Sequence, residues 1–291
     1  MTTAFVLSGG GSLGAVQVGM LLALADRQVV PDLFVGTSVG ALNAAFLAGR
    51  PGPRGIDELA GIWSRLRRQD IFPTTPARLL RAATGRESGF ADPAPLRRLV
   101  AEHLSYDRLE DAPWPVTVVA TEVTTGQEVQ LASGPAVDAV LASAALPAVF
   151  PPVAIDDHVL MDGGVVNNTP ISAAMSLGAD VIYVLPTGYA CALTAAPRSP
   201  VGMAMHAVTV AIQQRLIADV QSCQGQVTLR VAPTLCPLAV SPVDFRHTRE
   251  LIRRARRATQ GWLDAPFADD QSRHLRLHSH AHPALARQAA P

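Results

Sequence analysis

The chain has 291 residues, with 24 basic and 24 acidic side chains, 48% hydrophobic residues and a mean hydropathy of +0.22. This composition excludes a disordered chain, and the length allows one large core or two small ones. The balanced charge gives no overall reason to expect nucleic acid as a partner. Every basic residue is an arginine, which excludes lysine chemistry such as a Schiff base or a P-loop.

The start of the chain and its apolar runs predict neither a targeting segment nor a membrane span. The first residues include no basic region and no apolar stretch long enough for a signal peptide. No apolar run reaches the ~18 residues of a transmembrane helix. The cysteines are scattered, form no C-x-x-C pair and indicate a reducing compartment; they are Cys191, Cys223 and Cys236. We therefore expect a cytoplasmic protein whose contact with the inner membrane face is at most peripheral.

Two strand–turn–helix units open the chain. The first has a strand over 4–7, a turn of glycines, and a helix from about 13 to 27. The second has a strand over 33–35, a turn over 36–40 and a helix over 41–48. Both turns follow the carboxyl ends of strands, so the two turns can converge at one edge of a parallel sheet.

Strands and helices continue to alternate along the chain. Further strands are predicted over 115–123, 128–131, 159–162, 181–185 and 227–231, and further helices over 92–104, 137–145, 170–177, 201–221 and 244–263. This alternation predicts an α/β fold with parallel core strands in one domain over 1–266. The polar, histidine-rich residues 267–291 are expected to form a loose tail.

The segment Gly36-Thr37-Ser38-Val39-Gly40 matches the G-x-S-x-G nucleophile elbow. A serine at such a sharp turn has a strained backbone, and Gly36 and Gly40 lack side chains that would clash with it. The Ser38 hydroxyl then projects at the start of a helix, whose dipole and free N–H groups favour developing negative charge. The pattern predicts Ser38 as a nucleophile, against the plainer interpretation of a glycine- and serine-rich turn.

The first glycine turn permits two interpretations. Gly9, Gly11 and Gly14 match the G-x-G-x-x-G dinucleotide fingerprint, with Asp32 about 20 residues further on. The same turn can supply backbone N–H groups to an oxyanion hole beside Ser38. We favour the oxyanion hole, because a nucleophilic serine needs such donors on an adjacent loop, whereas a dinucleotide site needs no nucleophile elbow.

A nucleophilic serine also needs a base. No histidine has an obvious position for this role. Asp162, in Met161-Asp162-Gly163-Gly164, ends a predicted strand and is the outstanding carboxylate. The alternative is an ordinary turn aspartate, which is common before glycine. We assign no metal and no cofactor to the chain.

Four blocks of the sequence resemble the patatin-like phospholipases: SGGGSLGAVQVGML, GTSVGALNAA, ASAALPAVFPPV and DGGVVNNTPI. They occur in the family's order over about residues 4–185. The resemblance implies a three-layer α/β sandwich with a mostly parallel central sheet flanked by helices.

The resemblance also implies roles for particular residues. Ser38 would be the nucleophile and Asp162, with the motif glycines Gly163 and Gly164, its proton acceptor in a dyad without histidine. Gly9, Gly10 and Gly11 would form the oxyanion loop, and residues 142–152 would shape the pocket beside the dyad. Many members carry Arg or Lys where this chain has Leu13.

The activity implied is hydrolysis of lipid esters through an acyl-enzyme, with a phospholipid, lysophospholipid or neutral lipid as substrate. Three alternatives stay open. They are an acyltransferase on the same dyad, a nucleotide-binding α/β protein that uses the loop over 9–14, and a catalytically idle lipid-sensing or interaction protein.

The helix predicted over 244–263 is rich in arginine around an apolar stripe; its arginines are Arg246, Arg249, Arg253, Arg254, Arg256 and Arg257. Such a helix can approach anionic lipid, which makes it the candidate for peripheral membrane contact. We favour the alternative, in which the stripe packs on the sheet and the arginines stay in water.

Overall fold

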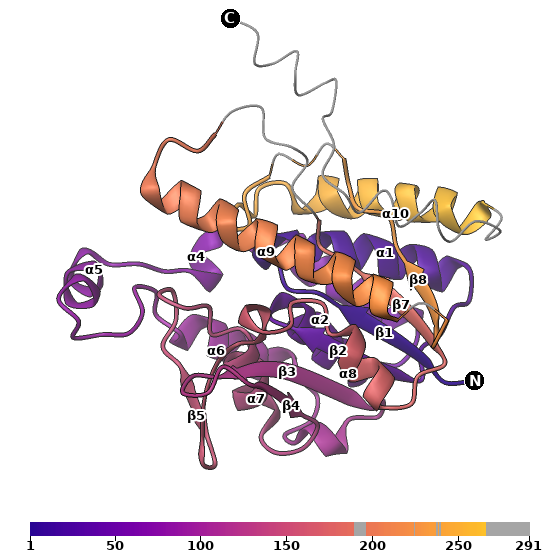
Figure 1. Cartoon of the computed structure of the whole chain (residues 1–291), viewed down its shortest axis with the longest axis horizontal. Helices are drawn as coiled ribbons and strands as arrows, with labels where there is room; N and C mark the ends of the chain where they lie inside the picture. Colours follow the sequence, from indigo (N-terminus) through magenta and orange to yellow (C-terminus); the bar gives the residue numbers. More distant parts are fainter. Residues whose placement is uncertain (189–195, 224, 237, 239, 266–291) are drawn as a thin grey trace, which may run out of the picture.

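The computed structural model describes residues 1–188, 196–223, 225–236, 238 and 240–265 (Figure 1). The described residues form an eight-stranded sheet in the order β5-β6-β3-β2-β1-β7-β8, with β4 paired to β3. The strands are β1 (Thr3–Leu7), β2 (Leu33–Thr37), β3 (Val116–Glu122), β4 (Glu128–Leu131), β5 (Val153–Ile155), β6 (His158–Asp162), β7 (Val181–Leu185) and β8 (Thr228–Val231). The tail expected over 267–291 lies outside the described residues.

The sheet is parallel from β3 through β2, β1 and β7 to β8, and antiparallel where β4, β5 and β6 join it. Helices cover both faces (Figure 1). The helices of the described residues, not all of which lie on the sheet, are α1 (Gly14–Asp26), α2 (Val39–Ala48), α3 (Pro53–Trp63), α4 (Arg68–Ile71), α5 (Pro76–Ala83), α6 (Ala94–His103), α7 (Ala136–Ser143), α8 (Ile171–Ser176), α9 (Pro200–Ser222) and α10 (Thr248–Asp264). The predicted α/β fold with a mostly parallel sheet between helices is therefore confirmed.

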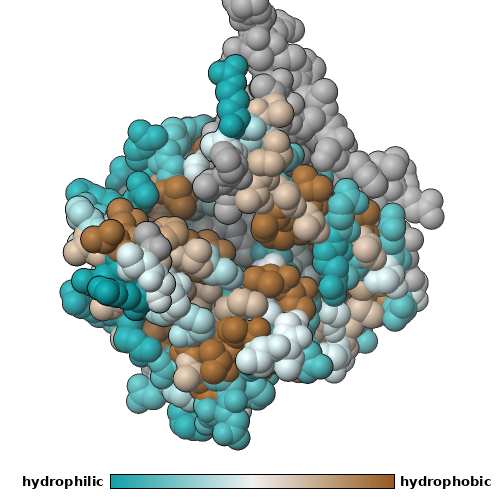
Figure 2. Space-filling view, turned by 60° about the vertical axis from the view of Figure 1, so that its left-hand side comes forward, coloured by the Kyte–Doolittle hydropathy of each residue, from teal (hydrophilic) through white to brown (hydrophobic). Residues whose placement is uncertain are grey.

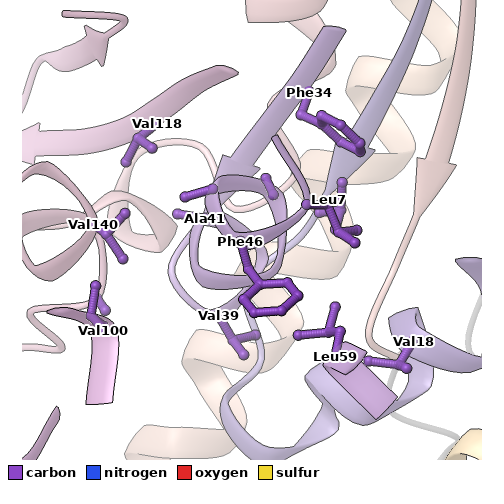
Figure 3. Packing of buried hydrophobic residues seen from close by; sticks show 14 of the residues in the cluster. Leu7, Val18, Phe34, Val39, Ala41, Phe46, Leu59, Val100, Val118 and Val140 are labelled. Carbon is purple, nitrogen blue, oxygen red and sulfur yellow. The ribbon is translucent and has the colours of Figure 1, made fainter. Parts of the chain in front are cut away.

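The alternation of side chains along β1 divides the core between the two faces. Phe5 and Leu7 belong to the larger cluster, which includes residues of α1, α2, α3 and α7 and is shown in part in Figure 3. Ala4 and Val6 belong to the second cluster, with residues of α8 and α9. Because both faces of β1 are buried, the strand has the continuous apolar run that is typical of a parallel core strand.

Most predicted elements are present, and a few boundaries differ. Strand β5 was not predicted, because its three residues carry too little periodicity. The arginine-rich helix begins at Thr248 and not at residue 244. The physical reason is an Asp244 carboxylate that accepts a hydrogen bond from the Arg246 N–H, at 2.9 Å, and so favours a turn before the helix.

Helix α10 packs on α1 and not on the sheet, which corrects the expectation for its apolar stripe. Leu251 and Ala255 are buried, and α10 approaches α1 closely at Gly19. Near the end of α10, the ring of Trp262 lies edge-on to Tyr183 of β7. The apolar face of α10 is therefore covered by the protein itself.

Candidate active site

Ser38 occupies a strained turn between β2 and α2. Its backbone has φ 54° and ψ −124°, outside the regions that ordinary residues prefer. A Cβ on Gly36 would lie 2.5 Å from the Gly40 carbonyl oxygen, and one on Gly40 would collide with the Leu7 carbonyl of β1. The two glycines therefore allow the turn to close tightly, and the serine hydroxyl stands at the start of α2.

The sheet brings Asp162 to this turn by an end-to-end arrangement of two strands. Val118 of β3 pairs with β2 on one edge and β4 on the other, and Ala120 pairs with β6 and β4. Strands β2 and β6 therefore share one edge of β3 and run toward each other. They meet where Thr37 pairs with Val119 and Asp162 with Ala120, so Ser38 and Asp162 are neighbours although 124 residues separate them.

The two side chains are in direct contact. The Ser38 hydroxyl donates a hydrogen bond to Asp162 Oδ2 at 2.6 Å, and Asp162 Oδ1 accepts one from the Gly164 N–H at 2.7 Å. Thr121 holds the Asp162 backbone, because its hydroxyl donates to the Asp162 carbonyl oxygen at 2.9 Å. Each carboxylate oxygen thus has its own donor, and the carboxylate faces the serine.

Burial raises the pKa of Asp162 from 3.8 to about 6, although the hydrogen bonds from Ser38 and Gly164 favour the charged form. The carboxylate is ionised at neutral pH, and its affinity for a proton is higher than that of an exposed aspartate. A carboxylate in this state is better matched to accept a proton from a hydroxyl.

Ser143, at the end of α7, fixes the strained backbone of Ser38. Its hydroxyl accepts a hydrogen bond from the Ser38 N–H at 2.8 Å and donates one to the Val119 carbonyl oxygen at 2.5 Å. The sequence analysis included Ser143 only as part of the block 142–152 and gave it no role. Ser143 is fully buried. Its role could be recognised only from the structure, because its hydroxyl links Ser38 to Val119 of β3.

The glycine loop after β1 lies beside Ser38. A Cβ on Gly9 would lie 3.2 Å from the Ser38 Cβ. The Gly9 N–H is occupied, since it donates to the Asn168 carbonyl oxygen at 3.0 Å. Within the described parts of the chain, the N–H groups of Gly10 and Gly11 have no hydrogen-bond partner. These two amides are therefore the loop donors that remain for a ligand, and the neighbouring Leu13 is buried and apolar.

A buried polar network holds the glycine loop in place. Gln17 donates to the carbonyl oxygens of Ser8 and Leu185 at 2.8 and 3.0 Å, and Asn43 donates to Gln17. The indole N–H of Trp63 in turn donates to Asn43 at 2.9 Å. These side chains come from three helices, so the loop conformation depends on how α1, α2 and α3 pack.

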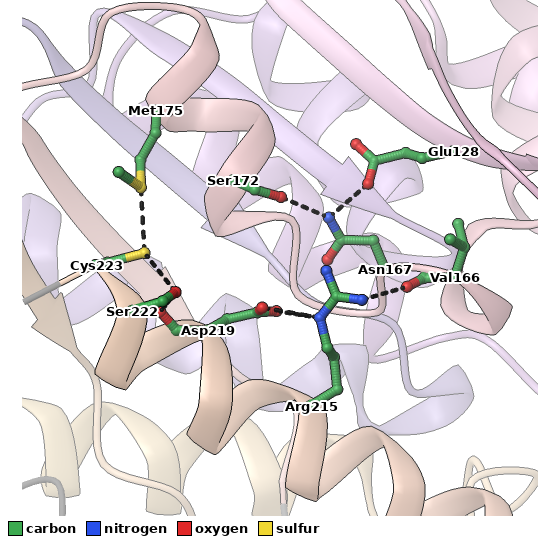
Figure 4. A network of polar contacts seen from close by, with 9 residues as sticks. All are labelled: Glu128, Val166, Asn167, Ser172, Met175, Arg215, Asp219, Ser222 and Cys223. Atoms are coloured by element: carbon green, nitrogen blue, oxygen red, sulfur yellow. Dashed lines mark hydrogen bonds and ion pairs between the residues drawn. The ribbon is translucent and has the colours of Figure 1, made fainter.

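A second network secures the loop that follows Asp162 (Figure 4). The side-chain amide of Asn167 donates to Glu128 and Ser172. Its backbone carbonyl oxygen accepts from the Thr37 hydroxyl at 2.9 Å. Arg215 of α9 is paired with Asp219 and reaches the Val166 carbonyl oxygen. The loop after Asp162 is thereby hydrogen-bonded to residues of β2, β4, α8 and α9. The sequence analysis missed this function of Asn167, which has no local pattern.

The dinucleotide alternative lacks its acidic residue. Asp32 precedes β2, at the amino edge of the sheet, and its carboxylate accepts from the Thr3 N–H at 2.7 Å. The fingerprint requires this residue at the carboxyl edge, beside the glycine loop. Within the described residues, no group of three or more His, Cys, Asp or Glu could hold a metal ion, and no helix is both long and apolar enough to span a bilayer.

The site is thus a strained serine with a buried carboxylate on its hydroxyl, at the carboxyl edge of an α/β sheet, which is an arrangement suited to acyl transfer. The chain belongs to the patatin-like phospholipase family, a family of carboxylic ester hydrolases, whose model matches residues 5–175.

The similar proteins include patatin-like phospholipase domain-containing protein 7 of Rattus norvegicus, 31% identical over 192 residues that make up 64% of this chain and 13% of that protein. They also include an NTE family protein of Mycobacterium bovis, 29% identical over 61% of this chain and 47% of that protein. The chain thus matches only a part of these relatives. The solved structure of VipD from Legionella pneumophila covers 90% of this chain and 66% of its own, with a TM-score of 0.48 and 16% identity.

Proposed function

We propose that the protein hydrolyses lipid esters, with Ser38 as the nucleophile and Asp162 as its proton acceptor. The observation that carries this proposal is the 2.6 Å hydrogen bond from the Ser38 hydroxyl to a buried carboxylate. Membership of the patatin-like family supports a lipid ester as the substrate class: a phospholipid, a lysophospholipid or a neutral lipid.

The first half of the reaction forms an acyl-enzyme. As Ser38 Oγ attacks the ester carbonyl, its proton passes to Asp162 Oδ2. The negative charge that develops on the carbonyl oxygen is held by the N–H groups of Gly10 and Gly11 and by the start of α2. When the tetrahedral intermediate collapses, the bond to the alcohol breaks and the alcohol leaves with the proton from Asp162.

The second half releases the acid. Asp162 accepts a proton from water while the water oxygen attacks the acyl carbon, and the same N–H groups hold the oxyanion. The bond to Ser38 Oγ then breaks, and the proton on Asp162 returns to the serine. The free fatty acid is the product that distinguishes hydrolysis from transfer to another alcohol.

The test is turnover of p-nitrophenyl butyrate by purified Ser38→Ala and Asp162→Asn. Each variant should lose activity by ~10³-fold or more, because each removes a group that takes part in bond formation. Ser176→Ala and Asp156→Asn are the matched controls, since they make the same chemical changes at exposed positions of α8 and the β5–β6 turn. Folded Ser38→Ala or Asp162→Asn protein with undiminished turnover would overturn the proposal.

A further inference from the structure

Helix α5 exposes leucines that no described part of the chain covers. It stands away from the body of the molecule on the side where the parallel strands end (Figure 1), and none of its described side chains is buried. Leu79 is 47% exposed and Leu80 67% exposed. The helix is nevertheless well terminated: Pro76 occupies its first turn, and the Thr75 hydroxyl accepts from the Arg78 N–H.

The segment that carries α5 leaves and rejoins the body beside the active site. On the way out, Phe72 stacks on Phe150 with ring centroids 5.6 Å apart. On the way back, the Phe90 N–H donates to the Ala148 carbonyl oxygen at 3.1 Å. Ala148 and Phe150 belong to the block 142–152, in which the Ala145 carbonyl oxygen accepts from the Asp162 N–H at 2.9 Å.

Exposed apolar side chains continue from α5 toward the dyad. Phe90 and Leu146 are both partly exposed, and Leu146 follows Ala145 directly in the chain. Figure 2 shows this side of the molecule, with hydrophobic side chains gathered toward the middle of the face and hydrophilic ones toward its margin. The exposed apolar residues therefore adjoin, in the sequence, the loop whose Ala145 carbonyl oxygen holds the backbone of Asp162.

The same segment is basic in a chain that is neutral overall. Residues 65–88 hold six arginines and two carboxylates, whereas the whole chain has 24 charges of each sign. Glu87 pairs with both Arg78 and Arg81, while Arg86 is exposed and has no ion-pair partner among the described residues. Exposed leucines flanked by arginines have the chemistry of an element that lies in the surface of an anionic bilayer.

We propose that α5, together with Phe90 and Leu146, docks on an anionic lipid bilayer and presents the Ser38–Asp162 site to it. This inference rests on the proposed function, since it specifies how a lipid ester reaches that site. It assigns the docking to α5 and not to α10. The apolar face of α10 is already covered by α1, which leaves that helix only its arginines for lipid.

Binding is measured with the full chain carrying Ser38→Ala, so that turnover does not alter the lipid. The probe is vesicles of equimolar phosphatidylglycerol and phosphatidylcholine, compared with vesicles of phosphatidylcholine alone. In this background, adding Leu79→Ser with Leu80→Ser should weaken partitioning to the mixed vesicles by ~10-fold or more, and Arg86→Glu should weaken it several-fold. Because α5 has no described buried side chain, the changes should leave the circular dichroism spectrum unaltered.

The matched control is Val30→Ser with Leu177→Ser. These two aliphatic side chains are 58% and 42% exposed, and they precede β2 and β7, at the opposite edge of the sheet. The control should bind vesicles as the parent does. Equal binding by the α5 double variant, or loss of binding only on charge reversal of Arg253 and Arg257 in α10, would overturn the proposal.

A second readout separates this proposal from the proposed function. With Ser38 intact, the ratio of vesicle-ester turnover to p-nitrophenyl butyrate turnover should fall at least fivefold in the α5 double variant. A several-fold rise in butyrate turnover would show instead that α5 covers the site, which contradicts docking. If the protein hydrolyses neither ester but binds vesicles through α5, the docking stands and the proposed function fails.

Discussion

Asp162 owes its affinity for protons to its position in the fold. Its carboxylate is buried where β6 meets the end of β2, and burial raises its pKa to about 6 while two hydrogen bonds favour the ionised form. An exposed aspartate would be ionised as well, but it would be a weaker base. Burial therefore gives a dyad without histidine a base suited to neutral pH.

The rate should depend on pH through this group. Because Asp162 must be ionised to accept the proton of Ser38, kcat/KM should be constant well above pH 6, reach half of that value at about pH 6 and fall further below it, as the folded enzyme protonates Asp162. The check is the pH profile of p-nitrophenyl butyrate hydrolysis, with folding monitored in parallel. An acid limb near 3.8, the ordinary pKa of an aspartate, would show that burial does not set the base strength.

Ser143 is the residue we expect to position the nucleophile. Ser143→Ala removes the acceptor of the Ser38 N–H, at 2.8 Å, and so relaxes a backbone held at φ 54°. We expect kcat to fall ~10-fold, equivalent to about 1.4 kcal/mol, with KM little changed. Ser176→Ala is the control at an exposed hydroxyl of α8.

A structural role alone for Ser143 would give a different result. In that case the variant would lose stability while the folded fraction kept its full kcat. Comparing kcat per active site, counted by fluorophosphonate titration, with the urea midpoint distinguishes the two outcomes. The acid limb of the pH profile should not move, because the Ser143 hydroxyl makes no hydrogen bond to the Asp162 carboxylate.

At the scale of elements, the sequence predicted most strands of the sheet well. Strands β4 and β7 have the predicted bounds, since runs such as that of β7 are apolar throughout and end at clear turns. Ser38 and Asp162 are where the sequence placed them, at strand ends. Their pairing was expected from the family resemblance, but strand patterns alone could not give it, because the contact depends on the antiparallel β6 sharing an edge of β3 with β2.

The packing partner of α10 was equally beyond the sequence. A stripe at helical spacing says that one face is buried but not what covers it. Gly19 in α1 permits the observed packing, because the absence of a side chain there lets the two helices approach. A Cβ there would lie 2.7 Å from the Ala255 Cβ and 2.8 Å from the Arg256 amide nitrogen.

This close approach makes a prediction for stability. Gly19→Ala should lower the free energy of unfolding by ~1–3 kcal/mol, because overpacking the α1–α10 contact outweighs the better helix propensity of alanine. Gly261→Ala is the matched control in α10, where a Cβ would meet no atom within 4 Å. It should raise stability by ~0.5–1 kcal/mol. Urea unfolding measures both, and a stabilising Gly19→Ala would contradict the packing argument.

At the scale of the whole molecule, the carboxyl edge of one sheet gathers every component of the proposed chemistry. The glycine loop follows β1, the nucleophile follows β2, and β6 delivers the aspartate from the other direction. The assignment of residues 1–266 to one domain stays a prediction. The charge balance of the chain hides an uneven distribution, since residues 65–88 beside this edge are basic.

The most direct test of the account is covalent labelling of the purified protein with methyl arachidonyl fluorophosphonate, followed by mass spectrometry of its peptides. The account predicts one adduct, on Ser38, that is absent from Ser38→Ala and forms much more slowly in Asp162→Asn. Labelling of another residue while Ser38 stays unmodified, or an undiminished rate in Asp162→Asn, would contradict the Ser38–Asp162 dyad.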